Sequence, residues 1–149
     1  MILRLKWINL LLLVGGLVFS QEFDAQLAQS LGADEYGMKM YSFVILKTGP
    51  TQIEDQEASA KLMRGHLDNI RRLAQEGQLI VAGPFGKNEL NYRGLFILTT
   101  DSPEKAHELL KTDPAIAAGV FEVEIIPWYG GAALGTYLET QKRITKTNP

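Results

Sequence analysis

The chain of 149 residues contains no cysteine and only two histidines, and its charges nearly balance. Without cysteine it has no disulfide framework, no thiol nucleophile and no lipid-modified lipoprotein start. A zinc site also lacks its usual ligands, so we predict no metal. The net charge of -2 is accompanied by scattered lysines and arginines, which leaves no basic surface for a nucleic-acid partner.

Familiar cofactor and nucleophile motifs are missing as well. The segment GPFGKN at 83–88 lacks the spacing and the final Ser or Thr of a phosphate loop, and no GxGxxG follows a predicted strand. No serine lies in a nucleophile elbow. We therefore predict no cofactor, so any catalysis would be proton chemistry by side chains.

What the N-terminus does contain is the pattern of a signal peptide at residues 1–20. Arg4 and Lys6 precede an apolar run, and short side chains precede a cleavage point near Ser20–Gln21. The alternative is a membrane anchor, but the run of roughly 13 residues is shorter than the roughly 20 that a spanning helix needs. We expect cleavage, export to the periplasm or the medium, and no stable membrane span afterwards.

Both segments that flank the central region are polar. Residues 21–37 are interrupted by Gly32 and Gly37, which favours a loose leader or a short helix. Residues 131–149 finish in a charged, threonine-rich tail that we expect to be partly ordered at most. One globular domain is therefore predicted at 38–130.

Hydrophobic periodicity within that domain predicts four strands and two helices. The strands are expected at 39–47, 79–86, 92–100 and from 121 to about Pro127, and the helices at 55–76 and 102–112. Gly77 is expected to end the first helix, and Ser102 with Pro103 to begin the second. The β-α-β-β-α-β order predicts a ferredoxin-like α+β fold with two helices over one face of an antiparallel sheet.

The second face of that sheet needs a cover. The strands at 39–47 and 92–100 carry large apolar side chains at both parities. A monomer would then expose more apolar area than monomers usually tolerate. We expect two sheets to pack face to face in a homodimer.

A series of short motifs resembles the YCII-related (YciI-like) family. The motifs follow one another between residues 39 and 129 as His66, Gly77, Gly83-Pro84, Gly94, Ser102-Pro103-Glu104, Asp113-Pro114, Gly119 and Pro127-Trp128. The resemblance implies a dimeric α+β barrel with a site built on His66 and Asp113. Relatives of this fold include muconolactone-isomerase-like and dehydrochlorinase-type proteins that act on small ring compounds. The signal peptide and a longer segment before His66 depart from the family, so its substrates are not carried over.

A histidine and an aspartate of this kind form a sensible acid/base unit. A carboxylate bonded to one imidazole nitrogen fixes the tautomer and leaves the other nitrogen to move a proton or polarise a carbonyl. One hypothesis is an exported enzyme that isomerises, eliminates from or hydrolyses a small cyclic substrate, with His66 as acid/base and Asp113 as its orienting partner. The alternative is a non-catalytic exported module that binds a ligand or has a structural role.

Each candidate site residue also has a structural interpretation. His66 could be a histidine at the edge of the core that bonds a backbone carbonyl. Asp113, followed by proline, is typical of a helix N-cap. Pro84, Phe85 and Trp128 are candidate substrate contacts, although the two aromatic side chains equally fit core or interface packing.

The remaining cations near the first helix are assigned to solvent. Arg64, Arg71 and Arg72 are expected on an exposed helix face. The second histidine, His107, lies among charged residues of the second predicted helix and is expected to be exposed as well.

Overall fold

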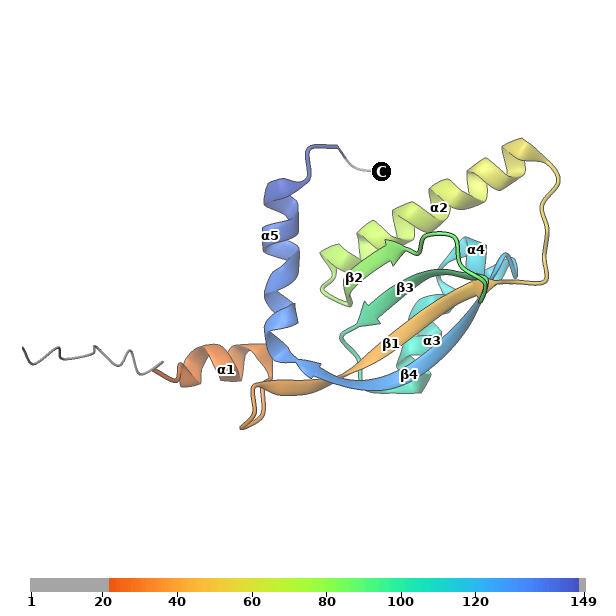
Figure 1. Cartoon of the computed structure of the whole chain (residues 1–149). Coiled ribbons are helices and arrows are strands. Elements are labelled where there is room, and N and C mark those ends of the chain that lie inside the picture. Colours follow the sequence, from red (N-terminus) through yellow and green to blue (C-terminus); the bar gives the residue numbers. More distant parts are fainter. Residues whose placement is uncertain (1–21, 148–149) are drawn as a thin grey trace, which may run out of the picture.

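The computed structural model of the protein describes residues 22–147 and shows an α+β fold built on one sheet (Figure 1). The strands are β1 (Met38–Thr48), β2 (Leu79–Pro84), β3 (Tyr92–Leu98) and β4 (Phe121–Gly131). The helices are α1 (Ala25–Leu31), α2 (Gln56–Gln75), α3 (Pro103–Lys111), α4 (Pro114–Ala117), the 3-10 helix η1 (Ala132–Thr136) and α5 (Tyr137–Ile144). The predicted signal peptide at 1–20 lies outside the described residues.

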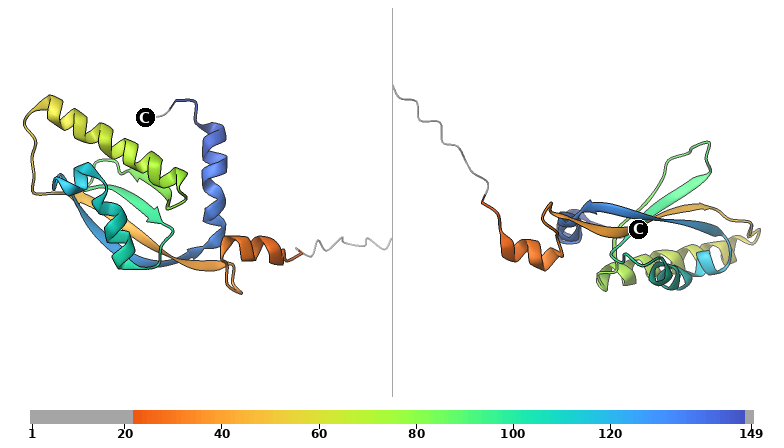
Figure 2. Two further views of the ribbon diagram at one scale, coloured as in Figure 1. Left: turned by 180° about the vertical axis from the view of Figure 1, so that it is seen from behind. Right: turned by 90° about the horizontal axis from the view of Figure 1, so that it is seen from below.

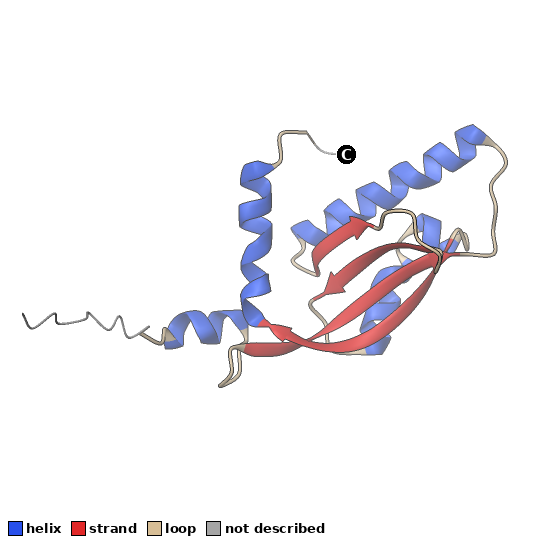
Figure 3. Ribbon diagram, viewed as in Figure 1, coloured by secondary structure: helices blue, strands red, loops and turns tan. Residues whose placement is uncertain are grey.

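The sheet has the strand order β2-β3-β1-β4, and every neighbouring pair is antiparallel (Figure 3). At the centre, Val44 of β1 lies opposite Phe96 of β3 and Ile125 of β4. Helices α2 and α3 cover the same face, as the view from below shows (Figure 2). The predicted β-α-β-β-α-β order and the ferredoxin-like arrangement are confirmed.

Local chemistry sets the ends of the two covering helices. Asp55 caps α2 by accepting a hydrogen bond from the backbone N–H of Ala58 at 2.7 Å. After α2 the chain turns at Gly77, whose φ of +69° lies in the left-handed region that favours glycine. Ser102 caps α3, and Pro103 occupies its first turn. The predicted helix stop at Gly77 and start at Ser102 are therefore confirmed.

The main hydrophobic core lies between the sheet and these helices. Its buried members include Val44, Leu46, Phe96 and Leu98 from the strands and Leu73, Ala106 and Leu110 from α2 and α3. Burying a side chain of the size of leucine or phenylalanine contributes about 1.5–3 kcal/mol. These contacts hold α2 in a fixed position over the sheet, which matters because α2 carries His66.

The opposite sheet face carries a second group of apolar side chains, called here the open-face cluster. It consists of Tyr41, Phe43, Ile80, Val81, Leu95, Ile97, Trp128 and Leu134. The ring centroid of Trp128 lies 5.7 Å from that of Tyr41 and 6.2 Å from that of Phe43. Leu134 of η1 packs at one end, but neither α2 nor α3 covers this face (Figure 2).

Strand β4 is longer than predicted. The sequence indicated an end near Pro127, but β4 continues to Gly131, and Pro127 lies opposite Ser42 of β1. Proline lacks the N–H of a ladder hydrogen bond and is therefore tolerated mainly at the edge of a sheet. Strand β4 pairs only with β1, so proline can lie inside this strand.

The segments that flank the sheet are helical. Helix α1 lies within 21–37, where a loose leader or a short helix was expected. The helices η1 and α5 lie within 131–149, which was expected to be partly ordered at most. The carboxylate of Asp34 ties the N-terminal segment to the sheet, since it accepts hydrogen bonds from the N–H groups of Tyr36 and Met38 and the hydroxyl of Tyr129. None of the helices in residues 22–147 is long and apolar enough to cross a membrane.

Candidate functional site

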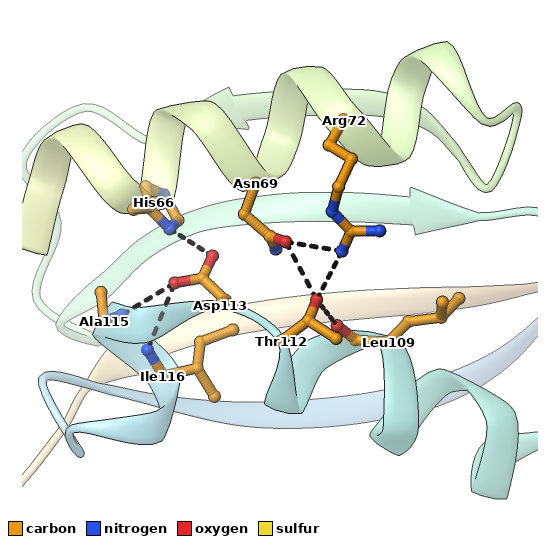
Figure 4. Close-up of polar contacts among 8 residues, drawn as sticks. All are labelled: His66, Asn69, Arg72, Leu109, Thr112, Asp113, Ala115 and Ile116. Carbon is orange, nitrogen blue, oxygen red and sulfur yellow. Dashed lines mark hydrogen bonds and ion pairs between the residues drawn. The ribbon is translucent and has the colours of Figure 1, made fainter.

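His66 and Asp113 meet beneath α2. His66 Nδ1 lies 2.6 Å from Asp113 Oδ2, a short distance typical of a charge-assisted hydrogen bond (Figure 4). The two residues come from α2 and from the junction between α3 and α4. His66 is 6% exposed and Asp113 is fully buried. The structure therefore brings together the two residues that the sequence singled out, in an environment where an unpaired charge would be costly.

Asp113 uses its two carboxylate oxygens for two different tasks. Oδ1 accepts hydrogen bonds from the backbone N–H groups of Ala115 at 2.9 Å and Ile116 at 3.4 Å, which caps α4. Oδ2 faces His66. A capping carboxylate is an acceptor, so Nδ1 of His66 is the donor and carries the ring proton. The helix-cap interpretation of Asp113 and its pairing with His66 are thus both correct.

The other imidazole nitrogen, Nε2, is left available. Nε2 makes no hydrogen bond with the described residues. If it were also fully buried, it would be a buried polar atom without a partner, but among the described side chains only Oε1 of Gln78 is such an atom. Nε2 therefore keeps accessible surface. The ring is held on its sides by Phe96, at a centroid distance of 6.0 Å, and by Phe121, at 5.2 Å.

His66 lines a cavity of about 330 Å³ between α2 and the sheet. The other lining residues are Leu46, Met63, Leu67, Ile70, Ala82, Gly83, Pro84, Arg93, Gly94, Phe96 and Phe121. Apart from His66 and Arg93 these residues are apolar or glycine, and the volume is typical of a pocket for a small molecule. The arrangement can present one basic nitrogen to an apolar, ring-sized ligand.

Gly65 is a residue that the sequence reasoning missed. A Cβ atom at this position would lie only 2.7 Å from Cγ of Pro114, the residue that follows Asp113. Glycine therefore lets α2 approach α4 closely enough for the neighbouring His66 to reach Asp113. A glycine beside the candidate histidine, inside an otherwise regular helix, is the signal that was available in the sequence.

The three predicted substrate contacts lie in three different places. Pro84 lines the cavity of His66. Phe85 is 38% exposed and lines an adjacent hollow of about 470 Å³, which Pro84 also borders. Trp128 belongs to the open-face cluster, on the other side of the sheet. The structure thus brings Pro84 to His66 and does not bring Trp128 to it.

Two further features concern the ionisable side chains. His107 is exposed on α3, as expected. In the part of the chain that the structure describes, no three His, Asp or Glu side chains gather closely enough to hold a metal ion.

Comparison with known proteins identifies the family. The model of the YCII-related domain matches residues 40–129. The chain belongs to the YCII-related domain family. This YCII-related domain contains β1 to β4 with α2, α3 and α4, whereas α1 and α5 lie outside it.

Two similar proteins illustrate the match. The uncharacterized protein YjpA of Bacillus subtilis (strain 168) is 34% identical over 89 residues, which cover 60% of this chain and 95% of that protein. A solved structure of 5-chloro-2-hydroxyhydroquinone dehydrochlorinase (TftG) from Burkholderia phenoliruptrix AC1100, in complex with 2,5-dihydroxybenzoquinone, is 21% identical with a TM-score of 0.41. That match covers 58% of this chain and 92% of the dehydrochlorinase chain.

Proposed function

We propose that this YCII-related protein is a small-molecule enzyme in which His66 moves a proton and Asp113 orients it. The observation that supports the proposal is the 2.6 Å contact between His66 Nδ1 and Asp113 Oδ2 beside a cavity of about 330 Å³. The contact fixes the ring and leaves Nε2 available. A base that is held by a carboxylate and opens into an apolar cavity meets the geometric requirement for general acid/base catalysis.

The proposed reaction begins with neutral His66. Nε2 takes a proton from a C–H or O–H group of the bound molecule, and the imidazolium that forms is stabilised by the carboxylate of Asp113. Return of the proton to a different atom of the substrate completes an isomerisation, and departure of a leaving group completes an elimination. If Nε2 instead takes its proton from water, the hydroxide adds to the carbonyl carbon of a lactone, the ring C–O bond breaks, and the proton on Nε2 passes to the departing oxygen.

The walls of the cavity support a small cyclic substrate. Phe96 and Phe121 flank the imidazole, and Pro84 lies at the same cavity as a candidate substrate contact. Apolar walls exclude water, which strengthens the electrostatic interaction between the imidazolium and Asp113. Proton transfer needs no cofactor, and the proposed enzyme is cofactor-independent.

The test is a search for turnover among small lactones and cyclic carboxylic acids, followed by NMR. We expect at least one compound to be converted by the wild-type protein and left intact by His66→Gln. His107→Gln is the matched control, because His107 is exposed on α3 and lies outside the cavity. Binding of the same compounds without conversion would favour the alternative, a ligand-binding module without turnover. Equal conversion by wild type and His66→Gln would contradict the proposed role of His66.

Export and assembly belong to the same proposal. We propose that residues 1–20 are removed during export to the periplasm or the medium, and that the mature protein is a homodimer built through the open-face cluster. The charged and apolar pattern of residues 1–20 supports the first point. The apolar face that α2 and α3 leave uncovered supports the second. The intact mass of the protein recovered from outside the cytoplasm tests export: a mass that includes residues 1–20 would contradict cleavage.

A further inference from the structure

A second polar bridge joins α2 to the α3–α4 junction, next to the one between His66 and Asp113 (Figure 4). Asn69 lies three residues after His66 on α2, so the two side chains occupy the same helix face about one turn apart. Thr112 directly precedes Asp113. Oγ1 of Thr112 lies within hydrogen-bond distance of Oδ1 of Asn69, at 2.9 Å. Neighbouring residues of the junction are therefore held by residues one turn apart on α2.

Arg72 completes this bridge. Its Nη2 lies 2.8 Å from Oδ1 of Asn69 and 2.8 Å from Oγ1 of Thr112, and it donates to both. Its Nη1 donates to both carboxylate oxygens of Glu76, at 2.9 and 3.0 Å. Arg72 is exposed, as expected, and its guanidinium also links α2 to the junction.

The hydrogen-bonding capacity of the Thr112 hydroxyl explains what Arg72 adds to this bridge. The single hydroxyl proton of Thr112 has two candidate acceptors, Oδ1 of Asn69 at 2.9 Å and the carbonyl of Leu109 at 2.6 Å. It can serve them well only one at a time. Arg72 donates to Asn69 and to Thr112 in either case, so the bridge persists whichever way the hydroxyl points.

We propose that Asn69 and Thr112, held by Arg72, are positioning residues. They keep the carboxylate of Asp113 within hydrogen-bond distance of His66 Nδ1. None of these three residues lines the cavity, so they act through Asp113 rather than on a ligand. Thr112 ends α3 and Asp113 begins α4, which means that one peptide unit separates the bridge from the carboxylate. A hydrogen bond of 2.6 Å tolerates little displacement, and a slide of about 1 Å would break it.

The experiment measures the imidazole itself. A proton shared over such a short distance resonates far downfield in proton NMR and exchanges slowly with water, so the Nδ1–H signal of His66 reports on the contact. Thr112→Val keeps the shape of the side chain without its hydroxyl, whereas Thr112→Ser keeps the hydroxyl. We expect Thr112→Val and Asn69→Ala to accelerate exchange of this proton at least about tenfold, and Thr112→Ser to stay within about twofold of wild type.

Ser42→Ala provides the matched control for lost stability. Ser42 is 1% exposed and its hydroxyl donates to the carbonyl of Thr100 at 2.9 Å, so the variant also loses a buried hydrogen bond, away from α2. We expect it to leave exchange of the His66 proton within about twofold of wild type, even though the protein unfolds more easily. Wild-type exchange in Thr112→Val, or equal acceleration in Ser42→Ala, would overturn the positioning role.

The positioning role rests on the proposed function only for the reason why Asp113 must be held in place; the hydrogen bonds themselves can be tested without it. The Nδ1–H signal is recorded without ligand, so it remains informative if no substrate is found. Accelerated exchange in Thr112→Val together with absence of turnover in wild type would support the positioning role and contradict the proposed enzymatic function. Turnover that depends on His66 but not on Thr112, with unchanged exchange in Thr112→Val, would contradict the positioning role and leave the proposed enzymatic function in place.

Discussion

The two faces of the sheet carry different kinds of side chain. The face covered by α2 and α3 has an apolar core that encloses buried polar groups, among them His66, Asn69 and Asp113. The opposite face carries the aromatic and aliphatic open-face cluster, and its ion pair, Lys47 with Glu124, is partly exposed. Side chains alternate along each strand, so one sheet serves both faces without conflict. The comparison teaches that the proposed site and the proposed dimer contact lie on opposite faces, so substitutions on one face should leave the other unchanged.

The largest effect is expected at the buried carboxylate of the covered face. Asp113→Ala removes the partner of His66 and the cap of α4, and we expect it to lower the free energy of unfolding by about 3–5 kcal/mol. Asp113→Asn keeps the shape and one capping oxygen and should cost about 1–3 kcal/mol. Urea denaturation measures both. Equal losses in the two variants would mean that the capping oxygen, which Asp113→Asn keeps, contributes nothing.

Gly65→Ala should have the next largest effect. Alanine normally stabilises a helix interior relative to glycine by up to about 1 kcal/mol. Here the added methyl group would lie 2.7 Å from Pro114, and we expect a net loss of about 1–3 kcal/mol together with a disturbed Nδ1–H signal of His66. Gly83→Ala is the control, since a Cβ atom at Gly83 meets nothing within 4 Å. A Gly65→Ala protein as stable as wild type would show that α2 and α4 separate without cost.

A substitution on the open face should change assembly more than stability. Ile126 lies opposite Phe43 and is 39% exposed. If the proposed homodimer forms through this face, Ile126→Asp should reduce the mass in sedimentation equilibrium to that of a monomer. We expect the stability of the monomer to change by less than about 1 kcal/mol and the His66 signal to persist. Ile144→Asp, on α5 with 72% exposure, is the control and should keep the wild-type mass. A wild-type protein that sediments as a monomer would contradict the proposed homodimer.

The smallest effect concerns the pH dependence of the N-terminal segment. The hydroxyl of Tyr129 and then the N–H of Met38 donate to Asp34, which lowers the pKa of that carboxyl below its ordinary value of 3.8. A lowered pKa in the folded state means that the stabilisation is present above the unfolded value and is lost as the pH falls through the folded value. We expect the protection of the Met38 amide against hydrogen exchange, relative to an unfolded chain at the same pH, to fall below roughly pH 4, and this acid-dependent step to disappear in Asp34→Asn. An unchanged acid response in Asp34→Asn would contradict the assignment.

Much of the covered face could be predicted from the sequence, because the relevant signals are local. Gly77, Ser102 and Pro103 act on their own helix ends, and periodicity marks which side of each element is apolar. His66 and Asp113 were paired through the family resemblance, since residues on separate elements leave no mark of their distance in the sequence.

The parts that the sequence did not reveal depend on contacts between distant segments. Trp128 could not be assigned to a face without the register of β4, which continues through Pro127. The contact of the exposed Arg72 with Thr112 could not be foreseen, because Thr112 is brought close only by folding. Helix α1 contacts η1 and α5 contacts β2, and each of these partners lies far from its helix in the sequence.

The extended pairing of β1 with β4 has a consequence for how the chain folds. Met38 lies opposite Gly131, so one side of the central strand acquires its neighbour only after almost the whole domain has been synthesised. Contacts between residues so far apart in sequence slow folding. A ribosome-bound chain that ends before Phe121 would still contain His66 and Asp113, but it would lack an edge of its sheet. The pair of His66 and Asp113 should therefore become protected from solvent late, in the same kinetic step that adds the last strand.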